Sequence, residues 1–324
     1  MRLPHNLIEN IGLVTDSPEE LIAALGAKCL DQEAQEIMRL FGLGLPPVTS
    51  LEALAVMTGY NPGFIWSLVD RPHKYYRVFD IPKGAQRRQI EAPQVALKLV
   101  QKWLSLHFER QWSPHNAVHG FVRGRSHISA ARMHVSAEWV VSIDVENFFP
   151  STLKSDVRSA LIRLGYQSEA SISIIECLCC RYERLAQGAP TSPVVSNIAL
   201  HLIDEAVQVV ADRHQAIFTR YADDIVLSGK GKVPNDIFLE LEPLFHGTSW
   251  RLSDRKRLVA ELPNRLKVHG LLVHGEQVRL TKGYRNRLRA FRYLNEQGRI
   301  RDADRRRIEG HLNYASQVEG EVEG

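Results

Sequence analysis

The stretch Ile217-Phe218-Thr219-Arg220-Tyr221-Ala222-Asp223-Asp224-Ile225-Val226-Leu227 decides the fold of this chain of 324 residues. Apolar runs on both sides of Tyr221-Ala222-Asp223-Asp224 predict a short β-hairpin that carries the two carboxylates on its turn. Adjacent acidic side chains between apolar strands repel each other and resist burial, so they are stable when water or a metal ion surrounds them. The pattern favours a divalent-metal site. The alternative is an ordinary hairpin with an acidic turn, since Asp is a common turn residue.

A third carboxylate strengthens the metal interpretation. The segment Trp139-Val140-Val141-Ser142-Ile143-Asp144 is apolar and β-branched, which predicts a buried strand with Asp144 at its end. Two Mg²⁺ ions about 3.5–4 Å apart need carboxylates brought together from separate strands. We expect Asp144 and Asp223 to supply them. Considered without the hairpin, Asp144 is better interpreted as a strand-end cap.

Composition sets the broad class of protein. The chain is 44% hydrophobic and has no apolar run of about 18 residues, which predicts a cytoplasmic protein of two or three subdomains without a membrane span. Cys29 stands alone, whereas Cys177, Cys179 and Cys180 cluster on one apolar segment. A metal-binding role is the alternative for this cluster, but no second Cys or His pair follows at zinc-like spacing. We therefore expect reduced thiols buried in a helix.

The net charge of +4 conceals a gradient along the chain. Residues 1–60 contain three Lys or Arg against eight Asp or Glu, whereas residues 251–310 contain seventeen against seven. Lys and Arg supply most of the non-specific affinity for a polynucleotide by neutralising phosphates. Runs such as Arg285-Asn286-Arg287-Leu288-Arg289 lack the mixed signs of an ordinary solvated helix face. The C-terminal part is therefore the expected nucleic-acid surface.

The acidic N-terminal part is predicted to be helical. Thr49-Ser50-Leu51-Glu52 has the spacing of a capping box, Gly59 ends that helix, and Asn61-Pro62 begins another. Such a helix–turn–helix is also compatible with DNA reading. However, the second helix, Gly63–Val69, offers no Arg, Asn or Gln to base edges. We expect it to pack against the rest of the protein or to recognise folded RNA by shape.

The motif Gln187-Gly188-Ala189-Pro190-Thr191-Ser192-Pro193 lies between the two acidic sites. The order of an Asp-x-x-x-Phe-Phe strand end, a Gln-Gly-x-Pro-x-Ser-Pro turn and a Tyr-x-Asp-Asp hairpin resembles the palm of a reverse transcriptase. The bacterial retron type is the most similar, and its blocks can be followed from about Tyr75 to Val318. The preceding Arg220 is usual in that group.

This resemblance implies an α+β, right-hand polymerase fold. Its parts would be an N-terminal helical region (1–70), fingers (71–135), a palm with an antiparallel sheet packed on helices (136–275) and a helical thumb (276–324). The palm range includes finger-side insertions and a primer-grip hairpin after Gly270. The thumb, a small helical bundle, is indicated by apolar residues at helical spacing: Leu288, Phe291, Leu294, Ile308, Leu312 and Ala315.

Two strands joined by a basic turn resemble the fingers hairpin of the family. They run from Tyr75 to Lys83, turn at Gly84, and continue from Arg87 to Pro93. Cations on a flexible hairpin can clamp the triphosphate of an incoming nucleotide, and the candidates are Lys83, Arg87 and Arg88. The alternative is a solvent-exposed basic hairpin without a substrate role, which would show the same sequence pattern.

The resemblance also implies roles for individual residues. Asp144, Asp223 and Asp224 would hold two Mg²⁺ ions, or Mn²⁺ in their place, with the Val145 carbonyl as a further ligand. Lys256 would donate a proton to the leaving pyrophosphate. Phe149 would lie under the sugar and exclude a 2′-hydroxyl, so that deoxynucleotides are preferred, whereas Phe148 is expected in the core. The remaining roles are nucleotide binding by Gln187 and Gly188, and RNA or primer binding by His134, His269, Gly270, Arg285 and Arg289.

The chain departs from the retron pattern at three places. Ala130-Ala131-Arg132-Met133-His134 stands where Asn-Ala-x-x-His is usual, Val268-His269-Gly270 stands where Val-Thr-Gly is usual, and Ser253 replaces an Asn. None of these changes affects the carboxylates. They bear on how the RNA is recognised.

The resulting hypothesis is an RNA-directed DNA polymerase. A retron enzyme would copy a structured non-coding RNA from the 2′-hydroxyl of an internal guanosine, form a branched RNA–DNA product, and act against phage with an effector protein. Its other partners would be deoxynucleotides and the cDNA. Two alternatives remain: another bacterial reverse transcriptase, and an RNA- or DNA-binding scaffold that restrains an effector.

Overall fold

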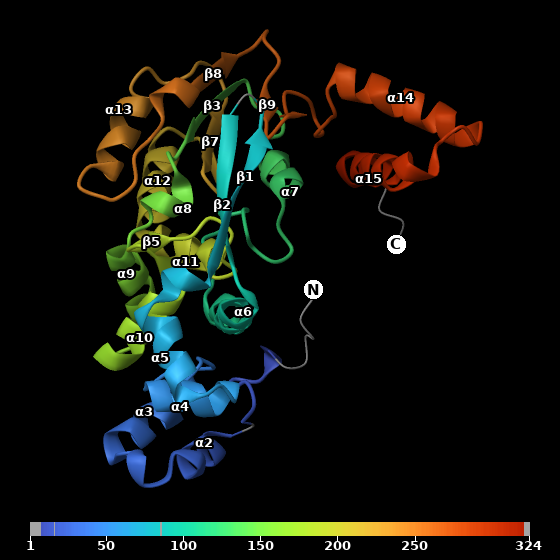
Figure 1. Cartoon of the computed structure of the whole chain (residues 1–324). Helices are drawn as coiled ribbons and strands as arrows, with labels where there is room; N and C mark the ends of the chain where they lie inside the picture. The colour runs from blue at the N-terminus through green and yellow to red at the C-terminus, as the bar shows by residue number, and fades with distance from the viewer. Residues whose placement is uncertain (1–7, 16, 85, 321–324) are drawn as a thin grey trace. The chain divides into compact units, whose positions relative to one another are not determined.

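The computed structural model describes residues 8–15, 17–84 and 86–320 (Figure 1). The chain forms two compact units, each assembled from separate stretches of sequence. The first unit comprises Met1–His115, Glu146–Ile203 and Gly247–Arg251, and the second comprises Asn116–Val145, Asp204–His246 and Leu252–Gly324. The residues predicted to act together are therefore divided between the two units.

The first unit is mostly helical. Its helices are α2 (Pro18–Leu25), α3 (Asp31–Gly42), α4 (Leu51–Thr58), α5 (Pro62–Asp70), α6 (Val95–Gln111), α8 (Phe148–Ser151), α9 (Lys154–Leu164), α10 (Glu169–Cys179) and α11 (Ser192–Ala199), with 3₁₀ helices η1 (Gly26–Lys28) and η2 (Pro72–Tyr75). Two antiparallel hairpins complete it, β1 (Tyr76–Lys83) with β2 (Gln86–Pro93), and β4 (Cys180–Arg181) with β5 (Arg184–Leu185). The two predicted strands on either side of Gly84 thus form the expected hairpin.

The N-terminal helix–turn–helix forms as predicted, with one change at its cap. Asn61 caps α5, and Gly59 ends α4 in the left-handed conformation with φ 67°. The capping residue of α4 is Ser50, whose hydroxyl accepts from the Ala53 N–H, so the expected cap at Thr49 is wrong. The Thr49 hydroxyl instead donates to Glu33 at 2.8 Å. A cap depends on which residue leaves the helical backbone conformation, and that occurs one residue later than the motif suggests.

The core of the first unit buries the apolar faces of these helices. Leu21, Ile37, Leu54 and Ile65 are fully buried, and Trp103 of α6 lies in the same cluster. Truncating one such side chain to Ala typically costs about 2–5 kcal/mol. Ile65 and Leu68 of α5 therefore belong to the core, which confirms that this helix packs against the protein. The cysteines are divided: Cys179 ends α10, Cys180 lies in β4, and both are buried free thiols.

The second unit is built on a four-stranded antiparallel sheet in the order β6–β7–β3–β8 (Figure 1). The strands are β3 (Trp139–Asp144), β6 (Ile217–Tyr221), β7 (Asp224–Gly229) and β8 (Leu258–Glu261). The predicted strand and hairpin are confirmed. A further hairpin pairs β9 (Lys267–Val268) with β10 (Leu271–Leu272), and Leu272 exchanges hydrogen bonds with Arg279.

The helices of the second unit include α7 (His127–Met133), α13 (Ile237–Leu241), α14 (Lys282–Glu296) and α15 (Asp302–Glu319), with 3₁₀ helices η3 (Glu242–Phe245) and η4 (Asp254–Lys256). Helix α12 (His201–Arg213) begins at the end of the first unit and continues here. Leu288 of α14 and Ala315 of α15 share an apolar cluster with Val140 and Val226 of the sheet. The expected thumb bundle is therefore a pair of described helices whose inner residues join the core of the sheet.

In the described part of the chain, no single helix combines the length and apolar character needed to cross a membrane. Two helices that meet at a bend, Ser192–Ala199 and His201–Arg213, are together long and apolar enough, by length and composition only.

Candidate active site

Three carboxylates meet at the ends of two adjacent strands. Asp144, the last residue of β3, pairs directly with Asp224, the first residue of β7. The Val145 N–H donates to the Asp223 carbonyl at 2.7 Å, which holds the end of β3 against the hairpin turn. All three acidic side chains are partly exposed. The antiparallel register thus brings together carboxylates that lie far apart in the sequence.

The turn that carries Asp223 has a demanding backbone geometry. Ala222 adopts the left-handed conformation with φ 57°, which is uncommon for a residue other than Gly. Gly120 passes very close to it, because a Cβ atom at position 120 would lie 2.2 Å from the Ala222 nitrogen. The His119 N–H also donates to the Arg220 carbonyl at 2.8 Å. The segment around Gly120 therefore packs against the turn of the hairpin and is hydrogen-bonded to its first strand.

A buried ion pair attaches the same hairpin to helix α12. The Arg220 guanidinium donates to both carboxylate oxygens of Asp204 in α12, at 2.6 and 2.7 Å, and both side chains are almost fully buried. The Arg220 Nη1 also donates to the Ala222 carbonyl at 3.0 Å. A bidentate pair fixes direction as well as distance. Arg220 thus links helix α12 to the strained residue that precedes Asp223.

The electrostatics of the site favour a bound cation. Burial raises the pKa of the Asp223 carboxyl, and the neighbouring Asp144 carboxylate raises it further. The Oδ1 atom of Asp224 is buried and has no hydrogen-bond partner among the described residues. A buried acceptor without a donor is costly, and a metal ion would satisfy it. Carboxylate and carbonyl oxygens are the ligands that Mg²⁺ prefers, so this set of residues fits that ion.

Lys256 reaches the site from η4. Its ammonium group forms an ion pair with Oδ2 of Asp144, and the hydrogen bond to that carboxylate raises the pKa of Lys256. The Ser253 N–H donates to the Asp144 carbonyl at 2.8 Å, so the segment before η4 is attached to the same strand end. Lys256 is therefore a protonated group in direct contact with the Asp144 carboxylate.

His269 also lies at the carboxylates. It occupies the turn between β9 and β10 with φ 49°, and its side chain is 8% exposed. Its Nδ1 lies 3.1 Å from Oδ2 of Asp224, and its ring packs against Tyr221 with the centroids 5.3 Å apart. Gly270 follows in the left-handed conformation with φ 83°. The sequence pattern linked His269 to RNA or primer, and it did not indicate the contact with Asp224.

His134 lies in the core of the second unit. Its side chain is fully buried, and its ring nitrogens lie 2.7 Å from the hydroxyls of Ser228 and Thr219. Burial lowers the pKa of His134 to about 3, so the ring is neutral near pH 7. Both nitrogens are occupied by protein groups. This arrangement argues against a direct RNA contact, and it makes His134 a buried link between α7 and strands β6 and β7.

Two of the predicted nucleotide-binding residues of the first unit, Gln187 and Gly188, contact strand β2. The Gln187 amide, oriented to satisfy its hydrogen bonds, donates to the Gln89 carbonyl and accepts from Arg88 Nε, each at 3.2 Å. Gly188 has φ 129°, and a Cβ atom there would lie 3.1 Å from the Glu91 carbonyl oxygen, so Gly allows the close approach. Arg87 is exposed on β2. The side chain of Lys83 lies outside the described residues.

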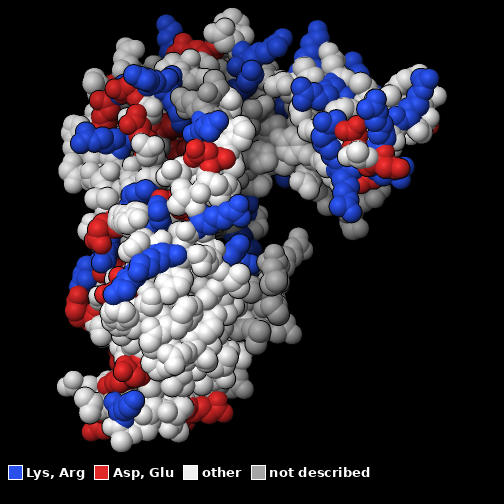
Figure 2. Space-filling model, viewed as in Figure 1, with Lys and Arg blue, Asp and Glu red and all other residues white. Residues whose placement is uncertain are grey.

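The other predicted residues divide between the core and the surface of the protein. Phe149 is half-buried on α8, and Phe148 beside it is 6% exposed and belongs to the core, as expected. Arg285 and Arg289 are exposed on α14. Figure 2 shows Lys and Arg gathered over α14 and α15. The basic C-terminal region of the sequence is therefore a basic surface of the folded chain.

Sequence reasoning missed Asp204, Gly120 and Glu91, which position the predicted residues. Asp204 follows Ile203 in a helix, and a carboxylate next to this buried position was the available signal. Gly120 had no local signal, because its need for Gly arises only from the approach of Ala222. Glu91 is 1% exposed and pairs with Arg181 and Arg184, which no local pattern indicates.

Comparison with known proteins shows the family of the chain. The family model of reverse transcriptase (RNA-dependent DNA polymerase) matches residues 81–294, and the chain belongs to this family. Within the family it is of the retron type. It is 29% identical over 259 residues to the Retron Ec86 reverse transcriptase of Escherichia coli, covering 78% of this chain and 80% of the relative. It is also 29% identical over 265 residues to the Retron Mx162 reverse transcriptase of Myxococcus xanthus, covering 71% and 54%.

Among solved structures, telomerase from Candida albicans is similar with a TM-score of 0.46 and 12% identity, covering 73% of this chain and 56% of that one. The family membership confirms the predicted polymerase fold class and identifies the chain as an RNA-directed DNA polymerase. Enzymes of this family use divalent metal ions and copy an RNA template into a DNA product.

Proposed function

We propose that Asp144, Asp223, Asp224 and the Val145 carbonyl hold two Mg²⁺ ions, which Mn²⁺ can replace, and that this is the polymerase site. The observation that carries the proposal is the meeting of Asp144 with the Asp223–Asp224 turn, next to the Lys256 ammonium. When bound, the ions supply activation of the primer hydroxyl and stabilisation of charge at the α-phosphate. The orphan Oδ1 of Asp224 and the raised pKa of Asp223 support a cation here.

Lys256 acts as the proton donor to the leaving pyrophosphate. Its raised pKa keeps a proton on Nζ at neutral pH, and its ion pair with Asp144 holds that proton beside the carboxylates. A positioned general acid typically contributes about 10²–10⁴-fold to a rate.

Nucleotide selection is assigned to the first unit. Lys83, Arg87 and Arg88 bind the triphosphate, and Gln187 with Gly188 faces the sugar and base. Phe149 lies under the sugar, where its ring excludes a 2′-hydroxyl. The contact of Gln187 with Arg88 supports a shared site for sugar and triphosphate.

RNA and primer are held by Arg285 and Arg289 and by the His269–Gly270 turn. The exposure of the two arginines on one helix supports phosphate contacts. We assign residues 1–70 to an N-terminal helical region, 71–135 to fingers, 136–275 to palm and 276–324 to thumb.

In the cell, the enzyme copies a structured non-coding RNA from the 2′-hydroxyl of an internal guanosine and forms a branched single-stranded DNA. This product belongs to an anti-phage defence system that includes an effector protein from the same locus. The similarity to curated retron reverse transcriptases supports this proposal.

The catalytic proposal is tested with the double variant Asp223→Asn, Asp224→Asn. Primer extension on an RNA template should fall by at least about 10³-fold, because a neutral amide cannot replace the ligating carboxylates. Asp212→Asn, an exposed change in α12, is the control and should retain activity. Undiminished extension by the double variant would contradict the assignment. Full phage resistance without DNA synthesis would instead support a scaffold.

The branched product is tested by sequencing the nucleic acid that co-purifies with the chain. We expect cDNA joined to RNA through a 2′–5′ linkage. Linear cDNA alone, from a preparation that extends primers normally, would contradict the retron-type product while leaving the polymerase assignment intact.

A further inference from the structure

Glu91 is a buried carboxylate at the base of the β1–β2 hairpin, outside the set of residues predicted to contact substrate. Its side chain is 2% exposed. It forms an ion pair with Arg181 and accepts hydrogen bonds from Arg184 at 3.2 and 3.3 Å. A buried carboxylate is stable only when it is paired, and two arginines pair with this one.

The two arginines are themselves neighbours on the β4–β5 hairpin. Arg181 and Arg184 pair directly across its two strands. Between them, Tyr182 and Glu183 both adopt left-handed backbone conformations, with φ 50° and 61°, which makes a tight turn. Like charges directly opposite each other destabilise a hairpin. The Glu91 carboxylate lies against both guanidinium groups and offsets part of this repulsion, so it connects the larger hairpin to the smaller one.

The connection continues into the predicted nucleotide site. The Glu91 N–H donates to the Gln187 carbonyl at 2.8 Å, and Gly188 approaches the Glu91 carbonyl closely enough that a Cβ atom would lie 3.1 Å away. Gln187 follows β5 by two residues, and its amide contacts Arg88 on β2. Both the carboxylate and the backbone of Glu91 therefore hold β2 against the segment that carries Gln187.

We infer that Glu91 is a positioning residue for nucleotide binding. By holding the base of the β1–β2 hairpin on Arg181 and Arg184, it sets the distance between the triphosphate-binding Arg88 and the sugar-facing Gln187. The inference rests on the proposed nucleotide site. Displacement of a binding group by about 1 Å can cost a factor of roughly 10².

The test is Glu91→Gln, which removes the charge and keeps the shape. Steady-state extension of a DNA primer on a homopolymeric RNA template separates KM for the deoxynucleotide from kcat. We expect KM to rise about tenfold with kcat within about threefold, because the loss lies in substrate binding. An unchanged KM would overturn the inference.

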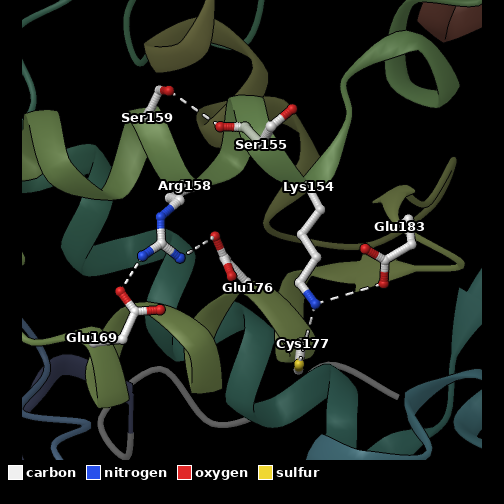
Figure 3. Close-up of polar contacts among 8 residues, drawn as sticks. All are labelled: Lys154, Ser155, Arg158, Ser159, Glu169, Glu176, Cys177 and Glu183. Carbon is white, nitrogen blue, oxygen red and sulfur yellow. Dashed lines mark hydrogen bonds and ion pairs between the residues drawn. The ribbon is translucent and has the colours of Figure 1, made fainter.

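The matched control is Glu176→Gln. Glu176 of α10 is also buried and also pairs with an arginine, Arg158 of α9, at 3.4 Å (Figure 3). Figure 3 shows Arg158 between Glu176 and Glu169, on helices rather than on the β1–β2 hairpin. This variant removes a comparable charge, and its KM should equal that of the wild type. An equal rise in KM for both variants would show a general loss of stability and would also overturn the inference.

A second variant decides the question if Glu91→Gln fails to fold. Arg184→Lys keeps the positive charge but loses the paired hydrogen bonds, at a side chain that is 28% exposed. If the Arg184→Lys protein folds, its KM should exceed that of the wild type by a smaller factor than the KM of Glu91→Gln does. An unchanged KM would overturn the inference. Absence of synthesis by the wild-type chain would instead overturn the proposed function, so the two failures are distinguishable.

Discussion

The Nδ1 atom of His269 lies 3.1 Å from Oδ2 of Asp224, so the β9–β10 turn contacts one of the three clustered carboxylates. The turn can therefore orient Asp224, because a hydrogen-bond partner of a metal-binding carboxylate restricts its direction. The resemblance alone placed this turn at the primer. The structure adds a contact with the carboxylates themselves.

We expect His269→Ala to raise the Mg²⁺ concentration for half-maximal primer extension by about tenfold, because residues that orient metal ligands typically contribute that much. The measurement is a Mg²⁺ titration at saturating deoxynucleotide. His246→Ala, an exposed change, should behave as the wild type. An identical Mg²⁺ requirement in both variants would contradict an orienting role.

We expect Arg220→Met to destabilise the chain by about 3–5 kcal/mol, because it leaves the Asp204 carboxylate buried and unpaired. The double variant Arg220→Met, Asp204→Leu should recover part of this loss, since no buried charge remains. Chemical denaturation measures both. Arg213→Met is the control, because Arg213 pairs with Glu240 at an exposed site, and it should cost no more than about 1 kcal/mol. Equal destabilisation of single and double variants would exclude the buried charge as the cause.

His134 should make stability depend on pH. Its pKa is lowered to about 3 in the folded chain, whereas an unfolded His titrates near 6.5. Below about pH 6.5 the unfolded state therefore binds a proton that the folded state does not, and stability falls as the pH falls. This amounts to about 2 kcal/mol between pH 7.5 and pH 5.

Chemical denaturation across that range should show a smaller pH dependence in His134→Gln, because Gln does not titrate. The exposed His246→Gln should keep the wild-type dependence. If His134→Gln and the wild type lose stability in parallel, another group controls the titration.

We expect Arg285→Ala, Arg289→Ala to weaken RNA–DNA binding and to reduce the slope of log affinity against log salt by about 2, one for each lost phosphate contact. Fluorescence anisotropy at several salt concentrations measures this slope. Arg163→Ala, an exposed change on α9, is the control and should leave the slope unchanged. A uniform slope in all three proteins would show that α14 does not contact phosphates.

Local physics explains what the sequence alone determined. Strand β3, the acidic hairpin and the caps at Asn61 and Gly59 follow from apolar β-branched runs, turn chemistry and backbone preference, which act over a few residues. The approach of Asp144 to Asp223 was also inferred, because a two-metal site requires both. The exact cap of α4 was missed, since Thr49 and Ser50 have the same capping chemistry.

Only the tertiary structure decided which distant groups pair. Segments that are remote along the chain are joined by the buried His134, the contact of His269 with Asp224, the Arg220–Asp204 pair and the pairing of Glu91 with Arg181 and Arg184. The type of an Arg, His or Glu side chain does not specify its partner, because the partner depends on the path of the backbone between the two residues. The sequence by itself therefore identified the carboxylates, while the fold determined which side chains position them.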